Sequence, residues 1–241
     1  MLSPSEIERY QRQIVLPDFG IEKQEKLKQA KILVVGVGGL GSVVSLYLTA
    51  AGVGQIGIVE QDIVSLTNLQ RQILYREEEI GQQKLYLAQK TLQKLNSNVK
   101  IIPYNCYLDA SNAEEIIKNY DIVMDCTDNY AARYVINDAC VALDKPFIHG
   151  TIGNTVGQLA VLNLGKPSSD YRVLYPDEKA MITQKNSSKG VIGVLPCVIA
   201  SLQTNEAIKI LTNSGVILKD TLLIIDLLTL ETRKFKLPTR K

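Results

Sequence analysis

The stretch KILVVGVGGLG (31–41) decides the fold of this 241-residue chain. Its first part, KILVVG (31–36), is a β-branched run of the kind that is buried on both faces of a parallel sheet. Its second part, GVGGLG (36–41), fits the pattern G-x-G-x-x-G and opens GLGSVVSLYLTAAG (39–52), which we predict to be a helix. We therefore expect a strand, a glycine turn and a helix, an arrangement that binds phosphate groups at the helix N-terminus.

Strand and helix patterns alternate through the first 150 residues. The further predicted strands are QIGIVE (55–60), KIIPY (100–104), DIVMD (121–125) and PFIHG (146–150), and the further predicted helices are 77–96, 112–120 and 129–143. Alternation of this kind predicts an α/β fold with a Rossmann-like, doubly wound and mostly parallel sheet.

The pattern changes beyond residue 150. Three runs read as strands with no crossover helix between successive strands, so we expect antiparallel strands to continue the sheet: GQLAVLN (157–163), TLLIID (221–226) and TRKFKL (232–237). Residues 168–190 are polar and weakly periodic, which predicts a long surface crossing, and 195–211 predict a helix. No linker or repeat divides the chain, and we predict one domain over 1–241 with a nucleotide-binding half at about 1–150.

Composition excludes several classes of protein. Twenty-seven Lys and Arg against 25 Asp and Glu leave a net charge of +2, too balanced for a nucleic-acid-binding face. Residues 32–59 carry no charge, but seven glycines interrupt them, so we expect a nucleotide fold there and no membrane span. The four cysteines form no C-x-x-C pair, and residues 1–13 have no apolar signal-peptide core. A reducing, cytoplasmic location is therefore expected.

Charged and polar residues follow the predicted strands at the edge where α/β sheets bind ligands. Glu60 ends the second strand, where an acid accepts hydrogen bonds from ribose hydroxyls. Asn68, Arg71, Gln72 and Lys84 come next, and Asp125 and Asp128 follow a later strand. NAD does not need an Arg and a Lys here, whereas the triphosphate of ATP does, and an Asp beside it suits Mg²⁺. The alternatives are that Arg71 and Lys84 are solvated surface cations and that Asp128 caps the N-terminus of a helix.

Six segments resemble one family, the adenylyltransferases of the ThiF and MoeB type, which activate ubiquitin-like sulfur carriers and share their fold with ubiquitin-activating enzymes. The segments span almost the whole chain, and the strings N-L-Q-R-Q and D-C-T-D-N are more specific than the glycine turn. They are RYQRQI (9–14), GVGGLG (36–41), SLTNLQRQ (65–72), GQQK (81–84), DCTDN (125–129) and SLQTNEAIKIL (201–211).

The resemblance implies roles for individual residues. Catalytic roles are implied for Arg12, Arg71, Lys84 and Asp128, and the expected ATP-binding residues are Gly36, Gly38, Gly39, Gly41, Glu60, Asp62, Asn68 and Gln72. In the family, the counterpart of Arg12 reaches the site of a second subunit, which implies a homodimer, and Asp128 would hold Mg²⁺. Residues from about 151 to 241 would bind the carrier and form the dimer.

The implied reaction joins two anions. The carrier's C-terminal glycine carboxylate attacks the α-phosphorus of ATP, pyrophosphate leaves, and an acyl-adenylate remains. Positive charge from Arg71, Lys84, Mg²⁺ and Arg12 in trans would cancel the repulsion. The leading expectation is a ThiS-like carrier of thiamine biosynthesis; a MoaD-like carrier of molybdenum-cofactor biosynthesis, or a small peptide or metabolite carboxylate, is the alternative. The sequence shows no rhodanese-like extension, so the sulfur donor is expected to be external.

The chain departs from the family pattern in three respects. Glu60 stands where the family commonly has Asp. The cysteine pairs of the family's zinc site have no counterpart near 171–176 or in the tail, so a metal assay is expected to find no zinc. Residues 177–190 contain no cysteine for a covalent intermediate, and Cys126 and Cys197 are expected to be buried packing residues.

One histidine and two tyrosines each allow two interpretations. His149, the one histidine, fits a structural role better than contact with nucleotide or carrier. Tyr10 and Tyr171 are either ligand contacts or residues of an amphipathic surface.

Two other functions compete with adenylylation, an NAD-dependent oxidoreductase and a nucleotide-binding scaffold without activity. The joint presence of Arg12, Arg71, Lys84 and Asp128 disfavours both.

Overall fold

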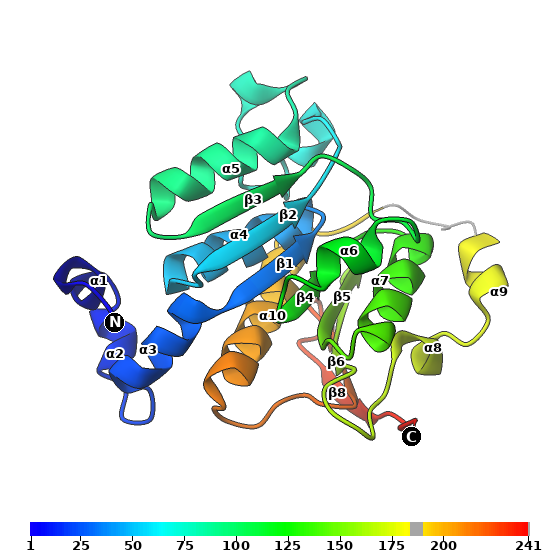
Figure 1. Ribbon diagram of the computed structural model, residues 1–241. Helices are drawn as coiled ribbons and strands as arrows, with labels where there is room; N and C mark the ends of the chain where they lie inside the picture. The colour runs from blue at the N-terminus through cyan, green and yellow to red at the C-terminus, as the bar shows by residue number, and fades with distance from the viewer. Residues whose placement is uncertain (184–189, 241) are drawn as a thin grey trace.

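A computed structural model describes residues 1–183 and 190–240 of the chain (Figure 1). Its centre is an eight-stranded sheet with the order β3-β2-β1-β4-β5-β6-β7-β8. The strands are β1 (Lys31–Val35), β2 (Gln55–Val59), β3 (Lys100–Tyr104), β4 (Ile122–Asp125), β5 (Phe147–Gly153), β6 (Val156–Leu162), β7 (Thr221–Asp226) and β8 (Thr232–Lys236). The first five strands are parallel and the last three are antiparallel. This confirms the predicted fold class, including the antiparallel continuation.

Helices cover both faces of the sheet (Figure 1). The helices are α1 (Pro4–Arg9), α2 (Gln11–Ile14), α3 (Gly20–Gln29), α4 (Gly39–Ala51), α5 (Lys84–Leu95), α6 (Ala113–Ile117), α7 (Tyr130–Ala142), α8 (Tyr171–Leu174), α9 (Glu178–Thr183) and α10 (Leu195–Thr212), with 3₁₀ turns η1 (Leu66–Asn68) and η2 (Glu77–Glu79). One buried cluster joins α4, α5 and α10 to one sheet face, and a second joins α6, α7 and α8 to the other.

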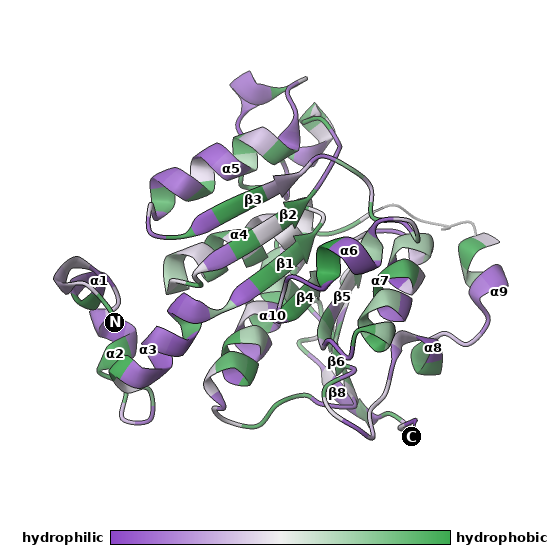
Figure 2. Ribbon diagram, in the orientation of Figure 1, coloured by the Kyte–Doolittle hydropathy of each residue, from purple (hydrophilic) through white to green (hydrophobic). Residues whose placement is uncertain are grey.

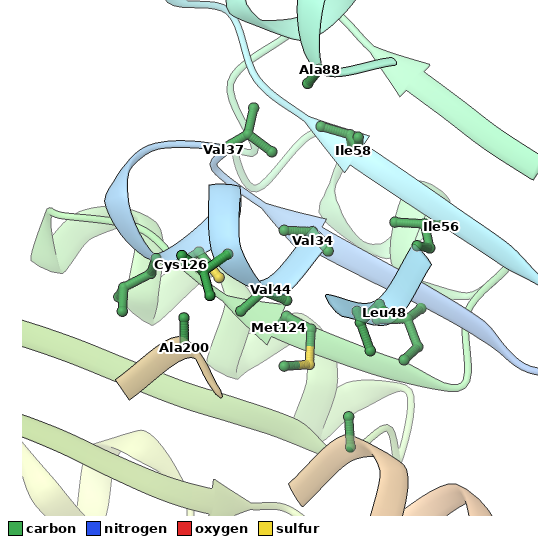
Figure 3. Packing of buried hydrophobic residues seen from close by; sticks show 14 of the residues in the cluster. Val34, Val37, Val44, Leu48, Ile56, Ile58, Ala88, Met124, Cys126 and Ala200 are labelled. Carbon is green, nitrogen blue, oxygen red and sulfur yellow. The ribbon is translucent and has the colours of Figure 1, made fainter. Parts of the chain in front are cut away.

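The alternation of side chains along each strand produces these two cores. Val34, Ile56 and Met124 lie on the face that Val44 and Leu48 of α4 cover (Figure 3). The central strands are largely hydrophobic and α3 is largely hydrophilic (Figure 2). The uncharged stretch 32–59 forms β1, α4 and β2, as expected of a nucleotide fold. In the described part of the chain, no helix has both the length and the apolar character needed to cross a membrane.

Two glycines allow the turn between β1 and α4 to close. Gly36 has φ +85°, a conformation that other residues rarely adopt. A Cβ atom on Gly41 would lie 1.8 Å from the carbonyl oxygen of Gly36, so only glycine fits where the helix passes this close to the strand end. The two residues therefore fix the direction in which the N-terminus of α4 points.

Two predicted segments differ in detail. The helix expected over 77–96 begins only at Lys84, because Gly81 takes φ +87° and ends the 3₁₀ turn before it. The expected surface crossing begins with buried residues: Ser169 and Tyr171 are fully buried, and Asp170 caps α8 by accepting from the Val173 N–H. Polarity misled here because Ser169 and Asp170 satisfy their hydrogen bonds internally. The rest of the crossing contains α9, and residues 184–189 lie outside the described residues.

Candidate nucleotide-binding site

A cavity of about 420 Å³ opens at the carboxyl ends of β1, β2 and β4. Nine of the residues predicted to form the site line it: Gly36, Gly38, Gly39, Glu60, Asp62, Arg71, Gln72, Lys84 and Asp128. Three predicted residues, Arg12, Gly41 and Asn68, do not line it. Residues separated by almost a hundred positions in the sequence therefore meet at this sheet edge, where open α/β sheets bind ligands.

Glu60 holds the glycine turn. Its Oε2 accepts from the Val37 N–H at 3.0 Å, and its Oε1 accepts from the N–H groups of Gln61 and Asp62 at 2.8 and 2.9 Å. The carbonyl of Val37 accepts from the hydroxyl of Tyr75 at 2.8 Å. Three backbone donors occupy most of the acceptor capacity of the carboxylate, so little is left for a ribose hydroxyl.

Lys84 supplies a buried positive charge at the start of α5. Its side chain is 5% exposed, and Nζ lies 3.3 Å from Asp62 Oδ2. The other oxygen of Asp62 accepts from the hydroxyl of Tyr107 at 3.0 Å, and this hydrogen bond raises the pKa of Tyr107. The solvated surface position considered for Lys84 is wrong, since the side chain is buried and lines the cavity.

Arg71 and Gln72 follow η1 along one wall. The Asn68 side chain closes η1 by accepting from the Ser65 N–H at 3.2 Å, so it shapes the wall from outside. Arg71 donates to the carbonyl of Thr67 at 3.1 Å and packs near Gly39. Gln72 is buried behind Gly38, and its Oε1 accepts no hydrogen bond from the described residues. This wall brings one cation and one unpaired amide to the glycine turn.

Asp128 is exposed on the opposite wall, in the turn between β4 and α7. The N-cap of α7 is Asn129, whose side chain accepts from the Ala132 N–H at 2.9 Å. Asp128 therefore has no capping role, which removes one structural explanation for an acid at this position. An exposed carboxylate beside a phosphate site is the kind of ligand that Mg²⁺ prefers.

Asp125 lies behind this turn and is fully buried. Its Oδ2 is 2.6 Å from His149 Nδ1, and its Oδ1 accepts from both the N–H and the hydroxyl of Thr127. Burial opposes ionisation, but the hydrogen bond from His149 and the charge of Arg133 prevail and keep the pKa of Asp125 low. Burial also lowers the pKa of His149, so the histidine is neutral. His149 is thus a structural residue, as expected, and neither it nor Asp125 lines the cavity.

The neutral, buried His149 predicts a pH-dependent stability. Its pKa is 6.5 in the unfolded chain and lower in the folded one, so below pH 6.5 the unfolded state binds the extra proton. The free energy of unfolding should therefore fall from pH 7 to pH 5, by up to about 1.4 kcal/mol per pH unit. Urea titrations of wild type and His149→Gln would measure this. The variant should lose the slope in this window, and an unchanged slope would contradict the assignment.

Of the two cysteines expected to be buried, one is buried and the other is exposed. Cys126 is buried, and burial raises its pKa well above the ordinary value, in agreement with a packing role. The packing role expected for Cys197 is wrong, because Cys197 is exposed on the first turn of α10. Its neighbour Pro196 is buried and faces Gly39. Within the described residues, no group of three or more His, Cys, Asp or Glu side chains is arranged to hold a metal ion.

The N-terminal segment lies away from the cavity. Helix α2, which carries the exposed Arg12, is at the end of the sheet opposite the carboxyl ends of the parallel strands (Figure 1). Tyr10 is buried and anchors this segment, because its hydroxyl accepts from Asn96 Nδ2 at 2.8 Å and its ring packs on Gly52. Tyr10 and Tyr171 are therefore core residues. Arg12 does not reach the cavity of its own chain.

Several side chains that line the cavity were not predicted from the sequence, Tyr107 and Arg133 among them. Tyr107 follows β3 on a loop with no recognisable motif. Arg133 lies one turn into α7, and only 5% of its surface is exposed. Its spacing from Asp128 gave a signal, since a residue in the first helical turns after a strand end faces the same edge.

Comparisons with known proteins agree with this geometry. The model of the ThiF family matches residues 10–241. A maize protein named adenylyltransferase and sulfurtransferase MOCS3-1 is 46% identical over 96% of this chain and 49% of its own length. A Thermus thermophilus protein named sulfur carrier protein adenylyltransferase is 44% identical over 95% of this chain and 86% of its own. The chain spans about half the length of the first curated relatives it matches. The crystal structure of PaaA shares the fold, with a TM-score of 0.85 over 98% of this chain and 84% of that one, at 24% identity.

Proposed function

The chain belongs to the ThiF family, and from this premise we propose that it is an enzyme that uses ATP to adenylylate the C-terminal glycine carboxylate of a ubiquitin-like sulfur carrier. The products are pyrophosphate and an acyl-adenylate, which a sulfur donor then converts to a thiocarboxylate. The names of the curated relatives support this proposal, since they describe adenylyltransferases and one names sulfur carrier proteins as the target.

The observation that carries the proposal is the convergence of cations on the glycine turn. Arg71 and Lys84 line one cavity with Gly38 and Gly39, at the N-terminus of the 13-residue helix α4. A triphosphate laid along this turn would accept from backbone N–H groups and lie near the positive end of the helix. The same cations would stabilise charge that develops on the α-phosphate as the carboxylate attacks.

Asp128 fits a role in holding Mg²⁺. Its carboxylate is exposed in the cavity, and in the described residues it accepts no hydrogen bond and caps no helix. When bound, Mg²⁺ would neutralise phosphate charge and help pyrophosphate to leave. The NAD-dependent alternative is disfavoured because Arg71 and Lys84 both line the cavity, and NAD does not need this pair of cations, whereas a triphosphate does.

The site needs a second subunit under this proposal. Arg12 is exposed on α2, outside the cavity of its own chain, so it can contribute only to the site of another copy. We propose a homodimer in which each Arg12 enters the partner's site and acts on the phosphates as arginine fingers do. Because each site would then depend on Arg12 of the partner, only the dimer would be active.

The carrier is either ThiS-like or MoaD-like. The N-L-Q-R-Q and D-C-T-D-N strings suit both types of enzyme. The name MOCS3 supports a MoaD-like carrier, and so does the name of a Porphyra purpurea relative, a probable molybdopterin-synthase adenylyltransferase. The ThiS-like carrier remains the other candidate.

ATP–pyrophosphate exchange tests the proposal. Purified ThiS-like and MoaD-like carriers ending in Gly-Gly are incubated with the enzyme, ATP, Mg²⁺ and labelled pyrophosphate. We expect label to enter ATP only with a cognate carrier. The matched control is the same carrier without its last glycine, which should support no exchange. Exchange that is absent with every carrier would contradict the proposal.

Cys197 is expected to have no part in forming the adenylate. It is exposed and does not line the cavity. Cys197→Ser should therefore keep wild-type pyrophosphate exchange, measured at saturating ATP and carrier. A loss of exchange in this variant would instead show that the thiol takes part in the first half-reaction.

A further inference from the structure

Arg133 is the buried charge of this site that the proposed reaction does not yet use. It is 5% exposed, and its Nε lies 3.8 Å from Oδ2 of the fully buried Asp125. Burying an ion pair is costly, and aliphatic residues of similar volume often give equal or greater stability. A buried pair beside a ligand cavity therefore suggests a functional role.

The contacts of Arg133 join three segments around the turn that carries Asp128. Its Nη2 donates to the carbonyl of Thr127 at 2.8 Å and to the hydroxyl of Thr151 on β5 at 3.0 Å. Its guanidinium lies 5.4 Å from the ring centre of Tyr130, which restrains it further. The fixed carbonyl of Thr127 belongs to the peptide unit whose nitrogen is that of Asp128, so this bond sets where the Asp128 backbone begins.

Asp125 secures the same turn from the other side. Its Oδ1 accepts from the N–H and the hydroxyl of Thr127 at 3.1 and 2.7 Å, while its Oδ2 faces His149 and Arg133. Thr127 is thus held through its N–H, its hydroxyl and its carbonyl by two buried, oppositely charged residues. A helix N-terminus or a simple turn needs no such arrangement, since Asn129 already caps α7.

We propose that Arg133 is a positioning residue that fixes the Thr127 carbonyl and so aims the Asp128 carboxylate at the divalent cation of the bound nucleotide. This inference rests on the proposed function, because it requires ATP with Mg²⁺ as the ligand. Arg133 therefore affects the binding of ATP with Mg²⁺ through Asp128. It makes no direct contact with phosphate in this proposal.

Calorimetric titration of ATP, with Mg²⁺ and separately in EDTA, tests the proposal on the full chain. Arg133→Met should weaken binding of ATP with Mg²⁺ about tenfold, as second-layer partners of metal ligands do, while the dissociation constant in EDTA stays the same. Arg133→Lys should resemble Arg133→Met, since a lysine keeps the charge but cannot make the same pair of hydrogen bonds. In an Asp128→Ala background, Arg133→Met should have no further effect.

Thr151→Val provides a milder variant in case the arginine variants fail to fold. It removes one hydrogen bond of Arg133 and no charge, and it should weaken binding with Mg²⁺ about threefold with no change in EDTA. Thr183→Val on α9 is the matched control and should bind as wild type. Equal weakening with and without Mg²⁺, rescue by lysine, or an effect that persists beside Asp128→Ala would overturn the proposal. If wild type binds no ATP in either buffer, the proposed function fails instead.

Discussion

Mixing Arg12→Ala subunits with Asp128→Ala subunits should restore pyrophosphate exchange at about a quarter of all sites. Each parent variant alone is expected to have an exchange rate about 10³-fold below that of wild type. Random pairing makes half of the dimers mixed. In each mixed dimer, one site combines an intact Asp128 with an intact Arg12 from the partner, and the other site lacks both. The expected recovery follows because Arg12 lies outside the cavity of its own chain.

The mixing experiment needs subunit exchange, which differently tagged wild-type subunits would demonstrate. Recovery is then measured at saturating carrier and ATP after exchange. The matched control is a mixture of Asp128→Ala with the double variant Arg12→Ala, Asp128→Ala, which contains no complete site in any pairing. Activity in that control, or no recovery in the test mixture, would contradict supply of Arg12 in trans.

Lys84→Ala should lower the exchange rate by about 10²–10³-fold at saturating ATP, because one preorganised donor to the developing charge is lost. The Lys84 side chain is 5% exposed, and its only charged partner among the described residues is Asp62, at 3.3 Å. Exchange kinetics and ATP titration together separate catalysis from binding. We expect the loss mainly in kcat, since Arg71 and the glycine turn still bind phosphate.

Lys90→Ala is the matched control for Lys84→Ala. Lys90 is a lysine of the same helix, outside the cavity, so its removal should leave exchange within twofold of wild type, as for surface charges in general. If Lys84→Ala also kept near wild-type exchange, the ammonium would have no part in the reaction, and its pairing with Asp62 would be structural.

Much of the fold was predictable because strand burial shows directly in the sequence. The run at 31–35 is β-branched on both faces since two helix layers cover β1, and the glycines at 36 and 41 follow from close backbone approach. The antiparallel pairs β5–β6 and β7–β8 were predictable because no helix stands between the two strands of either pair, whereas α10 separates β6 from β7. The buried start of the crossing was not, because Ser169 satisfies its polar groups through hydrogen bonds to Asp220 and Pro238 that no local pattern reveals.

The site was predictable where chemistry is local and unpredictable where it depends on packing. Asp128 follows the end of β4, and Arg71 and Lys84 lie in the segment that leads from β2 to the start of α5, so the sequence indicated the sheet edge that they share. The role of Arg133 on α7 depends on Thr151, 18 residues away on β5, and this contact has no sequence signal. Cys197 was misplaced because the start of a buried helix does not say which side faces the core. The buried positions Pro196, Ile199 and Ala200 leave Cys197 on the solvent side.

Intact-mass measurement of the carrier after incubation with enzyme, ATP and Mg²⁺ tests the central claim most directly, namely that cations around the glycine turn let a carboxylate attack ATP. A carrier ending in Gly-Gly should gain the mass of one AMP less one water, and Arg71→Ala or Lys84→Ala enzyme should leave nearly all of it unmodified. A carrier mass that stays unchanged with wild-type enzyme, while ATP is bound, would contradict the account.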